Sequence, residues 1–222
     1  MALFRTISLL VLGVFLMVGP ALAEETAPAG SVAPTADDNP PADIQGAERF
    51  IRTKHNKVRA VLRRRDTPKR AEQLTELLGQ FLDYDMLAQL SLDREWNERS
   101  PKERKRFVSL LRQLVERQYQ RNMESTLRYK VTWVGSEALD GTNVLVKSSA
   151  RSQVKKRQPP VAIDYSMHPD GNQWRVWDIS TDGVSLVKNY KRQFRRVISD
   201  EGWEGLIGRM EKKLNEEEDE LI

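Results

Sequence analysis

The stretch WRVWDISTDGVSLVKNYKRQF, residues 174–194, predicts a strand, a turn and a helix in direct succession. In its first six residues, two sets of side chains alternate with the period of two that is typical of a strand. Asp182-Gly183 is a turn signal that ends this strand. From Val187 onward the apolar residues recur at helical spacing, and lysine and arginine occupy the other helix faces. The sheet is therefore expected to end in a sharp turn that leads into an amphipathic, basic helix.

The first residues predict a cleaved signal peptide, residues 1–23. Arg5 precedes the apolar run 7–18, and Ala21-Leu22-Ala23 has the small-residue form of a cleavage site. A membrane span needs about 20 apolar residues, which is more than this run supplies. The chain has no cysteine, so we expect neither disulfides nor a lipid anchor. The mature protein is expected to diffuse freely in the periplasm.

The rest of the chain is expected to form one domain, residues 44–214. Residues 24–43 are rich in proline and lack apolar periodicity, which predicts a disordered leader. The acidic end, residues 215–222, is expected to fray.

The order of the predicted elements indicates an α+β fold. Four helices are expected first, at residues 44–65, 68–80, 83–92 and 101–123. Four strands follow, at residues 128–135, 142–149, 161–167 and 173–180. Two C-terminal helices are expected at residues 184–199 and 203–214. We therefore predict helices packed on one face of a four-stranded antiparallel meander sheet.

Charge is unevenly distributed along the sequence. There are 36 lysines and arginines against 32 acidic residues, for a net charge of +4. Acidic residues are frequent in 24–43 and 211–222, so the segment between them is strongly basic. This segment suits an acidic partner, such as a membrane surface, an acidic protein or a polyanion, and it also suits ordinary solvated helix surface.

The sequence gives no support for catalysis, a metal or a cofactor. His55 and His168 are the two histidines, and we expect both at the surface, because a metal site needs three or four convergent ligands. Asp178 and Asp182 could in principle be paired carboxylates, but a strand-end hydrogen bond and a turn residue explain them better. Nucleic-acid binding is disfavoured because the aromatic residues follow core periodicities.

Each predicted strand has one apolar side, and the helices would supply the opposing wall. A close-packed core and a cavity give the same pattern, so the residues alone leave both open.

The opening stretch also resembles a known family. The pattern W-x-V-x-D followed by D-G-V-S-L-V-x-N-Y-x-x-Q-F resembles the signature of the MlaC-type periplasmic phospholipid-binding proteins, also called the toluene-tolerance family. Further similar segments are FLDYDM at 81–86, Ser100-Pro101 with its helix, and GWEGLI at 202–207. The resemblance covers roughly residues 44–212.

The resemblance implies a soluble periplasmic phospholipid carrier, not an enzyme. Such a carrier holds acyl chains in an apolar cavity between sheet and helices and keeps the headgroup at the surface. It exchanges lipid with an inner-membrane ABC transporter that bears MCE domains and with an outer-membrane lipoprotein complex, in the service of outer-membrane lipid asymmetry. A dozen buried methylenes would contribute on the order of 10 kcal/mol. We expect a monomer.

Shared apolar faces suggest which side chains would contact the lipid. From the sheet we expect Val131, Trp133, Val144, Val146, Ile163, Tyr165 and Met167, and from the helices Met86, Leu90, Tyr190 and Phe194. The cations expected near the headgroup or a partner are Lys191, Arg192, Arg195 and Arg196. A periplasmic adaptor or chaperone that binds protein through this basic face is the alternative function.

Overall fold

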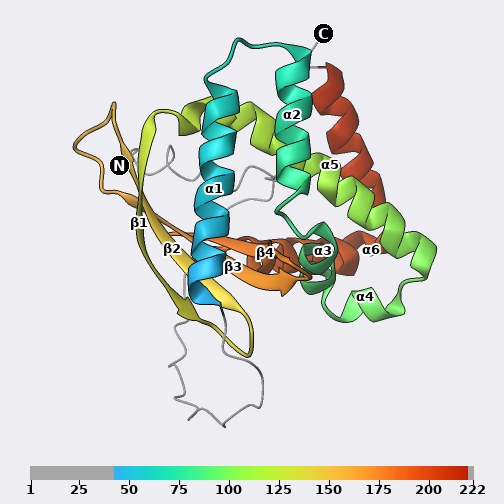
Figure 1. Cartoon of the computed structure of the whole chain (residues 1–222). Coiled ribbons are helices and arrows are strands. Elements are labelled where there is room, and N and C mark those ends of the chain that lie inside the picture. Colours follow the sequence, from blue (N-terminus) through green and yellow to red (C-terminus); the bar gives the residue numbers. More distant parts are fainter. Residues whose placement is uncertain (1–42, 220–222) are drawn as a thin grey trace.

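The computed structural model describes residues 43–219 and shows helices gathered against one twisted sheet (Figure 1). The predicted signal peptide, residues 1–23, and all but the last residue of the predicted leader, residues 24–43, lie outside the described residues. Residues 220–222 lie outside them as well.

Six helices and five strands make up the described chain. The helices are α1 (Ile44–Leu62), α2 (Pro68–Gly79), α3 (Tyr84–Leu92), α4 (Arg94–Glu98), α5 (Pro101–Thr126) and α6 (Leu186–Asp219). The strands are β1 (Tyr129–Ala138), β2 (Val144–Ser152), β3 (Val161–Asp170), β4 (Gln173–Thr181) and β5 (Val184–Ser185).

Local sequence signals set several helix starts. The Asp43 carboxylate accepts a hydrogen bond from the Gly46 backbone N–H at 2.8 Å and caps α1. At the start of α5, Ser100 and Glu103 form a capping box, in which the Ser100 N–H donates to Glu103 Oε2 at 2.7 Å and the Glu103 N–H donates to Ser100 Oγ.

The sheet has five strands, so the prediction of four strands is wrong by one. The strands pair in the order β1-β2-β3-β4-β5, and each pair is antiparallel, which is the predicted meander. The additional strand β5 exists because Asp182 and Gly183 both have positive φ angles, 49° and 79°. Two such residues turn the chain back tightly enough for Val184 to pair with Thr181.

Two β-bulges interrupt the ladders. One lies in β1 between Trp133 and Gly135. The other lies at Trp177 in β4, because Met167 pairs with Val176 whereas the preceding Ser166 pairs with Asp178. An extra residue in one strand changes which side chains face a given side.

The two predicted C-terminal helices are successive parts of α6. Gly202, with φ 73° and ψ −177°, is non-helical and divides them. The element continues to Asp219, so residues 215–219 of the predicted acidic end are helical. On the first part of α6, Val187, Tyr190, Phe194 and Val197 are buried, which is the predicted apolar face.

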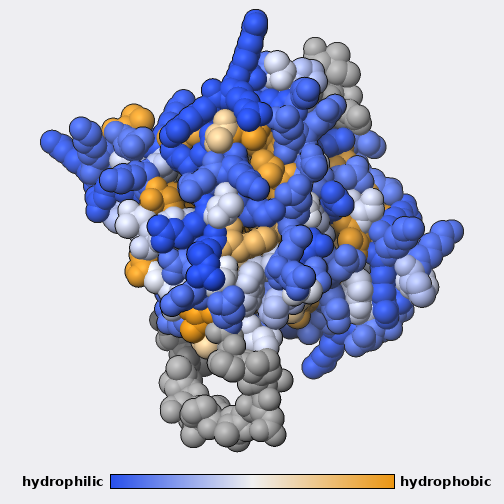
Figure 2. Space-filling view, viewed as in Figure 1, coloured by the Kyte–Doolittle hydropathy of each residue, from blue (hydrophilic) through white to orange (hydrophobic). Residues whose placement is uncertain are grey.

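The core consists of two packed groups of buried side chains. The helical cluster is formed by α3, α5 and α6, with Leu111, Leu206 and Ile207 almost fully buried. The sheet cluster joins α1 and α2 to β2, β3 and β4. The surface around them is largely hydrophilic with small, separate apolar spots on the face in view (Figure 2).

Candidate functional site

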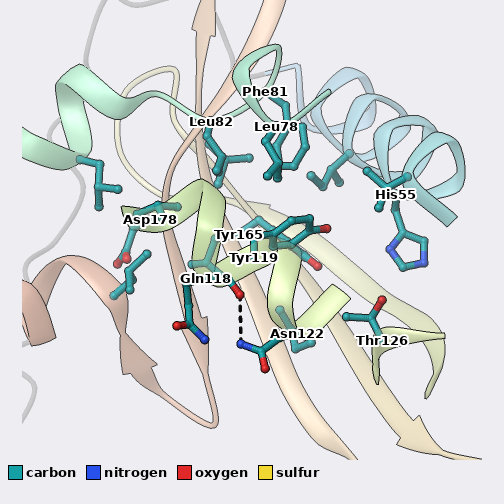
Figure 3. A pocket seen from close by; sticks show the side chains of 18 of the residues that line it. His55, Leu78, Phe81, Leu82, Gln118, Tyr119, Asn122, Thr126, Tyr165 and Asp178 are labelled. Atoms are coloured by element: carbon teal, nitrogen blue, oxygen red, sulfur yellow. Dashed lines mark hydrogen bonds between the residues drawn. The ribbon is translucent and has the colours of Figure 1, made fainter. Parts of the chain in front are cut away.

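A cavity of about 170 Å³ lies where the two clusters meet. Its wall is built from α1, α2, α3, α5, the first residues of α6, and strands β1 to β4 (Figure 3). Most of the lining is apolar, including Ile51 and Val58 of α1, Leu78 of α2, and Phe81 and Leu82 after it. An apolar cavity of about 150 Å³ can stay dry and bind an apolar molecule. This wall therefore suits hydrocarbon better than water.

The bulge at Trp177 explains part of the wall. Four consecutive residues of β4, Val176 to Ile179, line the cavity. In a regular strand only alternate residues would reach one side. The irregular register therefore brings more of β4 to the cavity than alternation allows.

Four tyrosines line the cavity, and for three of them burial favours the uncharged phenol. Burial raises the pKa of Tyr165 to about 12, and burial also raises the pKa values of Tyr119 and Tyr190. Their phenols therefore add hydrogen-bonding groups to an apolar wall without adding charge.

The polar lining gathers mainly at one end of the cavity. His55 and Arg59 of α1, Asn122 and Thr126 of α5, and Tyr129 at the start of β1 form this polar end, and all five are half-buried. In Figure 3, His55 and Thr126 lie on the opposite side of the cavity from Leu82 and Asp178.

Arg59 holds the polar end together. The Nη1 atom of Arg59 donates hydrogen bonds to the backbone oxygens of Thr126 at 3.3 Å and Tyr129 at 3.1 Å. Its guanidinium has no carboxylate in salt-bridge range among residues 43–219. Burial, followed by the charge of Arg63, lowers the pKa of Arg59. Arg59 is therefore a half-buried cation whose positive charge no described acid neutralises.

His55 was expected at the surface, and this expectation is wrong. Its ring lines the cavity and meets the Trp133 ring edge-on at a centroid distance of 5.8 Å. Burial, helped by the nearby Arg59 charge, lowers the pKa of His55 below its ordinary value of 6.5. The imidazole is thus held mainly neutral at neutral pH.

Of the side chains predicted to contact lipid, four line the cavity: Val131, Ile163, Tyr165 and Tyr190. Val144, Val146 and Met167 do not line it; they are fully buried in the packed sheet cluster.

The other four predicted contacts also lie outside the lining. Trp133 packs between His55 and Tyr165. Phe194 stacks on Tyr190 at 5.3 Å within the helical cluster. Leu90 packs against the same cluster, and Met86 is half-buried on α3.

The four predicted surface cations lie together on α6, away from the cavity lining. Lys191, Arg192, Arg195 and Arg196 border a shallow surface groove with Lys188. Lys191 Nζ lies 2.9 Å from Asp93 Oδ2, and Arg195 approaches the same carboxylate at 3.6 Å.

Several residues that line the cavity were not predicted. Helical spacing of apolar residues in the sequence could have identified some of them. Val115 and Tyr119 of α5 are four residues apart, so their helical spacing puts them on one face. Ile51, Leu78 and Phe81 lie on elements that the sequence could not place opposite the sheet. Only the tertiary arrangement identifies these side chains.

Asp178 has the structural role that was predicted for it, because it accepts hydrogen bonds at the end of a strand. Its carboxylate accepts from Ser185 Oγ at 2.5 Å and from the Val187 N–H at 3.0 Å. Across residues 43–219, no three histidine, cysteine or acidic residues are grouped so that they could hold a metal ion. No helix in the same range is long and apolar enough to cross a membrane.

Comparison with known proteins gives two likenesses. The model of the MlaC protein family matches residues 52–212. A phospholipid-binding protein from Ralstonia solanacearum, solved in complex with a phospholipid, has a similar structure, with a TM-score of 0.65. The two sequences are 24% identical, and the match covers 77% of this chain and 98% of the Ralstonia chain. This likeness supports the fold. The comparison with curated proteins gives no match.

Proposed function

The chain belongs to the MlaC protein family, and from this premise we propose that it is a periplasmic phospholipid carrier that holds acyl chains in the cavity. The similar Ralstonia protein was solved with a phospholipid, and the predicted signal peptide supports export. Carrying a lipid requires binding and release without a chemical reaction.

The observation that carries the proposal is the amphipathic character of the cavity. Its wall is apolar, and its polar end contains Arg59, a half-buried cation without a described acidic partner. A phospholipid has the same division, with apolar tails and an anionic phosphate. Each buried methylene contributes about 0.8 kcal/mol, and a guanidinium forms strong hydrogen bonds with phosphate.

We place the acyl chains against Val131, Ile163, Tyr165 and Tyr190, and the phosphate near Arg59. The α6 cations were predicted to face a headgroup or a partner. Because they lie on an exposed groove rather than on the cavity, we assign them to a partner surface. The partners proposed are the inner-membrane MCE transporter complex and the outer-membrane lipoprotein complex that the family resemblance implies. Their use of the α6 surface should weaken with salt.

Native mass spectrometry of the mature protein tests the carrier function directly. The expected spectrum shows the protein with one phospholipid after incubation with vesicles. Ile163→Asn places an amide in the cavity wall and should remove the lipid while the protein stays folded. The matched change Val146→Asn buries an unpaired amide in packed core and should lower the free energy of unfolding by about 2 kcal/mol or more.

A second comparison tests the phosphate position. Arg59→Gln should weaken retention of phospholipid about tenfold, the loss expected for one charge-assisted hydrogen bond. Retention of diacylglycerol, which lacks phosphate, should hardly change. Absence of any lipid on the wild-type protein after vesicle incubation would exclude the carrier function.

A further inference from the structure

Six residues at one end of the sheet form an exposed surface that the cavity does not use. We call this surface the cationic end: Arg128, Arg151, Val154, Lys155, Lys156 and Arg157. All six are exposed. Among the side chains that the structure describes, no carboxylate lies within salt-bridge range of its five cations.

The loop after β2 brings these charges together in a defined conformation. The Gln153 N–H donates to the Arg128 oxygen at 2.8 Å, which joins the loop to the start of β1. Ser152 Oγ accepts from the Lys155 N–H at 2.9 Å, and the Gln158 N–H donates to the Lys155 oxygen at 3.0 Å. The like charges are therefore held close to one another by the backbone.

The exposed side chain of Val154 makes this surface different from an ordinary basic loop. Its 69% exposure is the largest of the four exposed large apolar side chains in the described chain. It directly precedes Lys155, Lys156 and Arg157 in the sequence. An exposed apolar side chain beside several cations is the composition of segments that enter the interface of anionic membranes.

The cationic end borders the polar end of the cavity. Tyr129 pairs with Ser152, the last residue of β2 before the loop. Tyr129 also lines the cavity, and its backbone oxygen accepts from Arg59. The turns at the opposite end of the sheet contain Asp140 and Asp170. The cationic end also has one turn acid, Asp182 between β4 and β5, whose Oδ1 accepts from the Ala162 N–H at 2.9 Å, but its five cations outnumber this acid. The two ends of the sheet thus differ in charge, which would orient the molecule at a negative surface.

We propose that the cationic end is a docking surface for an anionic lipid bilayer, with Val154 entering the headgroup region. Docking in this orientation brings the polar end of the cavity next to the bilayer. The inference goes beyond lipid carriage, because vesicle binding through this surface does not depend on what occupies the cavity.

The absence of cysteine allows a site-specific test. Val154→Cys, labelled with a polarity-sensitive fluorophore, is mixed with vesicles that contain phosphatidylglycerol or with vesicles of phosphatidylcholine alone. The label should report a more apolar environment only with phosphatidylglycerol, and high salt should reverse the change. Leu139→Cys is the matched control, since Leu139 is also exposed but lies at the opposite end of the sheet. Equal responses from both labels would overturn the proposal.

Vesicle cosedimentation of the unlabelled full-length mature protein measures the role of the charges. Lys155→Gln, Lys156→Gln and Arg157→Gln together should weaken binding to phosphatidylglycerol vesicles about a hundredfold, because each cation near an anionic surface contributes about fivefold. The control triple variant changes Arg94, Lys102 and Lys105 to glutamine, with the same loss of charge.

The control cations lie on α4 and at the start of α5. The 26 residues of α5 span about 39 Å, and its other end leads into β1 at the cationic end, so the control cations lie far from that surface. The control variant should bind almost as the wild type does. Equal losses in the two triple variants would overturn the proposal. Binding to polyglutamate but not to vesicles would overturn it as well and would assign the surface to an acidic protein.

Discussion

Asp178 is the residue that makes the strand–turn–helix stretch possible. Its buried carboxylate accepts from the Ser185 hydroxyl and from the Val187 N–H, one of the free donors in the first turn of α6. Ser185 in turn accepts from the Lys188 N–H at 3.0 Å. A negative charge at a helix N-terminus is also favourable. The abrupt change from sheet to helix is therefore stabilised by two side chains.

His55 should make stability depend on pH. Its pKa is lowered in the folded state, so the unfolded chain binds more protons once pH falls below about 6.5. The folded state should therefore lose stability as pH falls through this region, and the loss should level off below the lowered pKa.

Urea unfolding of the wild type and His55→Gln across this pH range measures the effect. The free energy of unfolding of the wild type should fall relative to that of His55→Gln as the pH becomes acidic. All other titrating groups are the same in the two proteins, so their contributions cancel in the difference. A difference that stays constant with pH would contradict the lowered pKa.

The sequence predicted the apolar side of each strand but not the cavity wall. Ile163 and Tyr165 lie on the predicted side of β3 and line the cavity. Val144 and Val146 follow the same alternation in β2, yet α1 packs against this strand and they are fully buried. Alternation gives the direction of a side chain, and the distance to the facing helix depends on tertiary packing. The bulge at Trp177 likewise has no signature in a single sequence.

At the scale of elements, α6 shows how one glycine divides a helix. The φ and ψ angles of Gly202 lie in a region that essentially only glycine adopts. The change of direction lets both parts of α6 contribute to the helical cluster, with Phe194 before the break and Leu206 after it.

Two glycines of α6 give a matched test of this break. Gly202→Ala should lower the free energy of unfolding by about 1–3 kcal/mol through backbone strain alone, because no atom lies within 4 Å of the added methyl. Gly208→Ala has the same free space in regular helix and should stabilise the protein by about 0.5–1 kcal/mol. Both values come from urea unfolding, and the same sign for both variants would contradict the role of Gly202.

Long elements were predicted well, whereas short ones were missed. α1, α2, α3 and α5 correspond to the four predicted N-terminal helices, with boundaries that coincide or differ by at most three residues. α4 has five residues and β5 has two, which is too short for periodicity to appear. β5 depends on the backbone angles of Asp182 and Gly183. The sequence predicted a turn at these residues, but it did not predict that the residues after the turn would pair with β4.

At the scale of the whole molecule, the proposed binding of lipid in the cavity would raise the stability of the folded state. A ligand that binds only the folded state at about a thousand times its Kd stabilises that state by about 4 kcal/mol. For a chain of this size the gain corresponds to about 10 °C in Tm.

Calorimetry before and after the bound lipid is extracted measures this coupling. The loaded wild type should unfold about 10 °C above the stripped protein, and Ile163→Asn should show no difference between the two preparations. Coincident transitions for loaded and stripped wild type would indicate a cavity that takes no lipid.

The cavity lies at the border between the helical cluster and the sheet cluster, and this position affects the protein when the cavity is empty. Each cluster is packed within itself, and the ligand would lie along their shared border. If the proposed carrier releases its lipid, contacts along that border would be lost, whereas those within each cluster would remain. The empty protein would then be less stable but still folded, and it could bind lipid again.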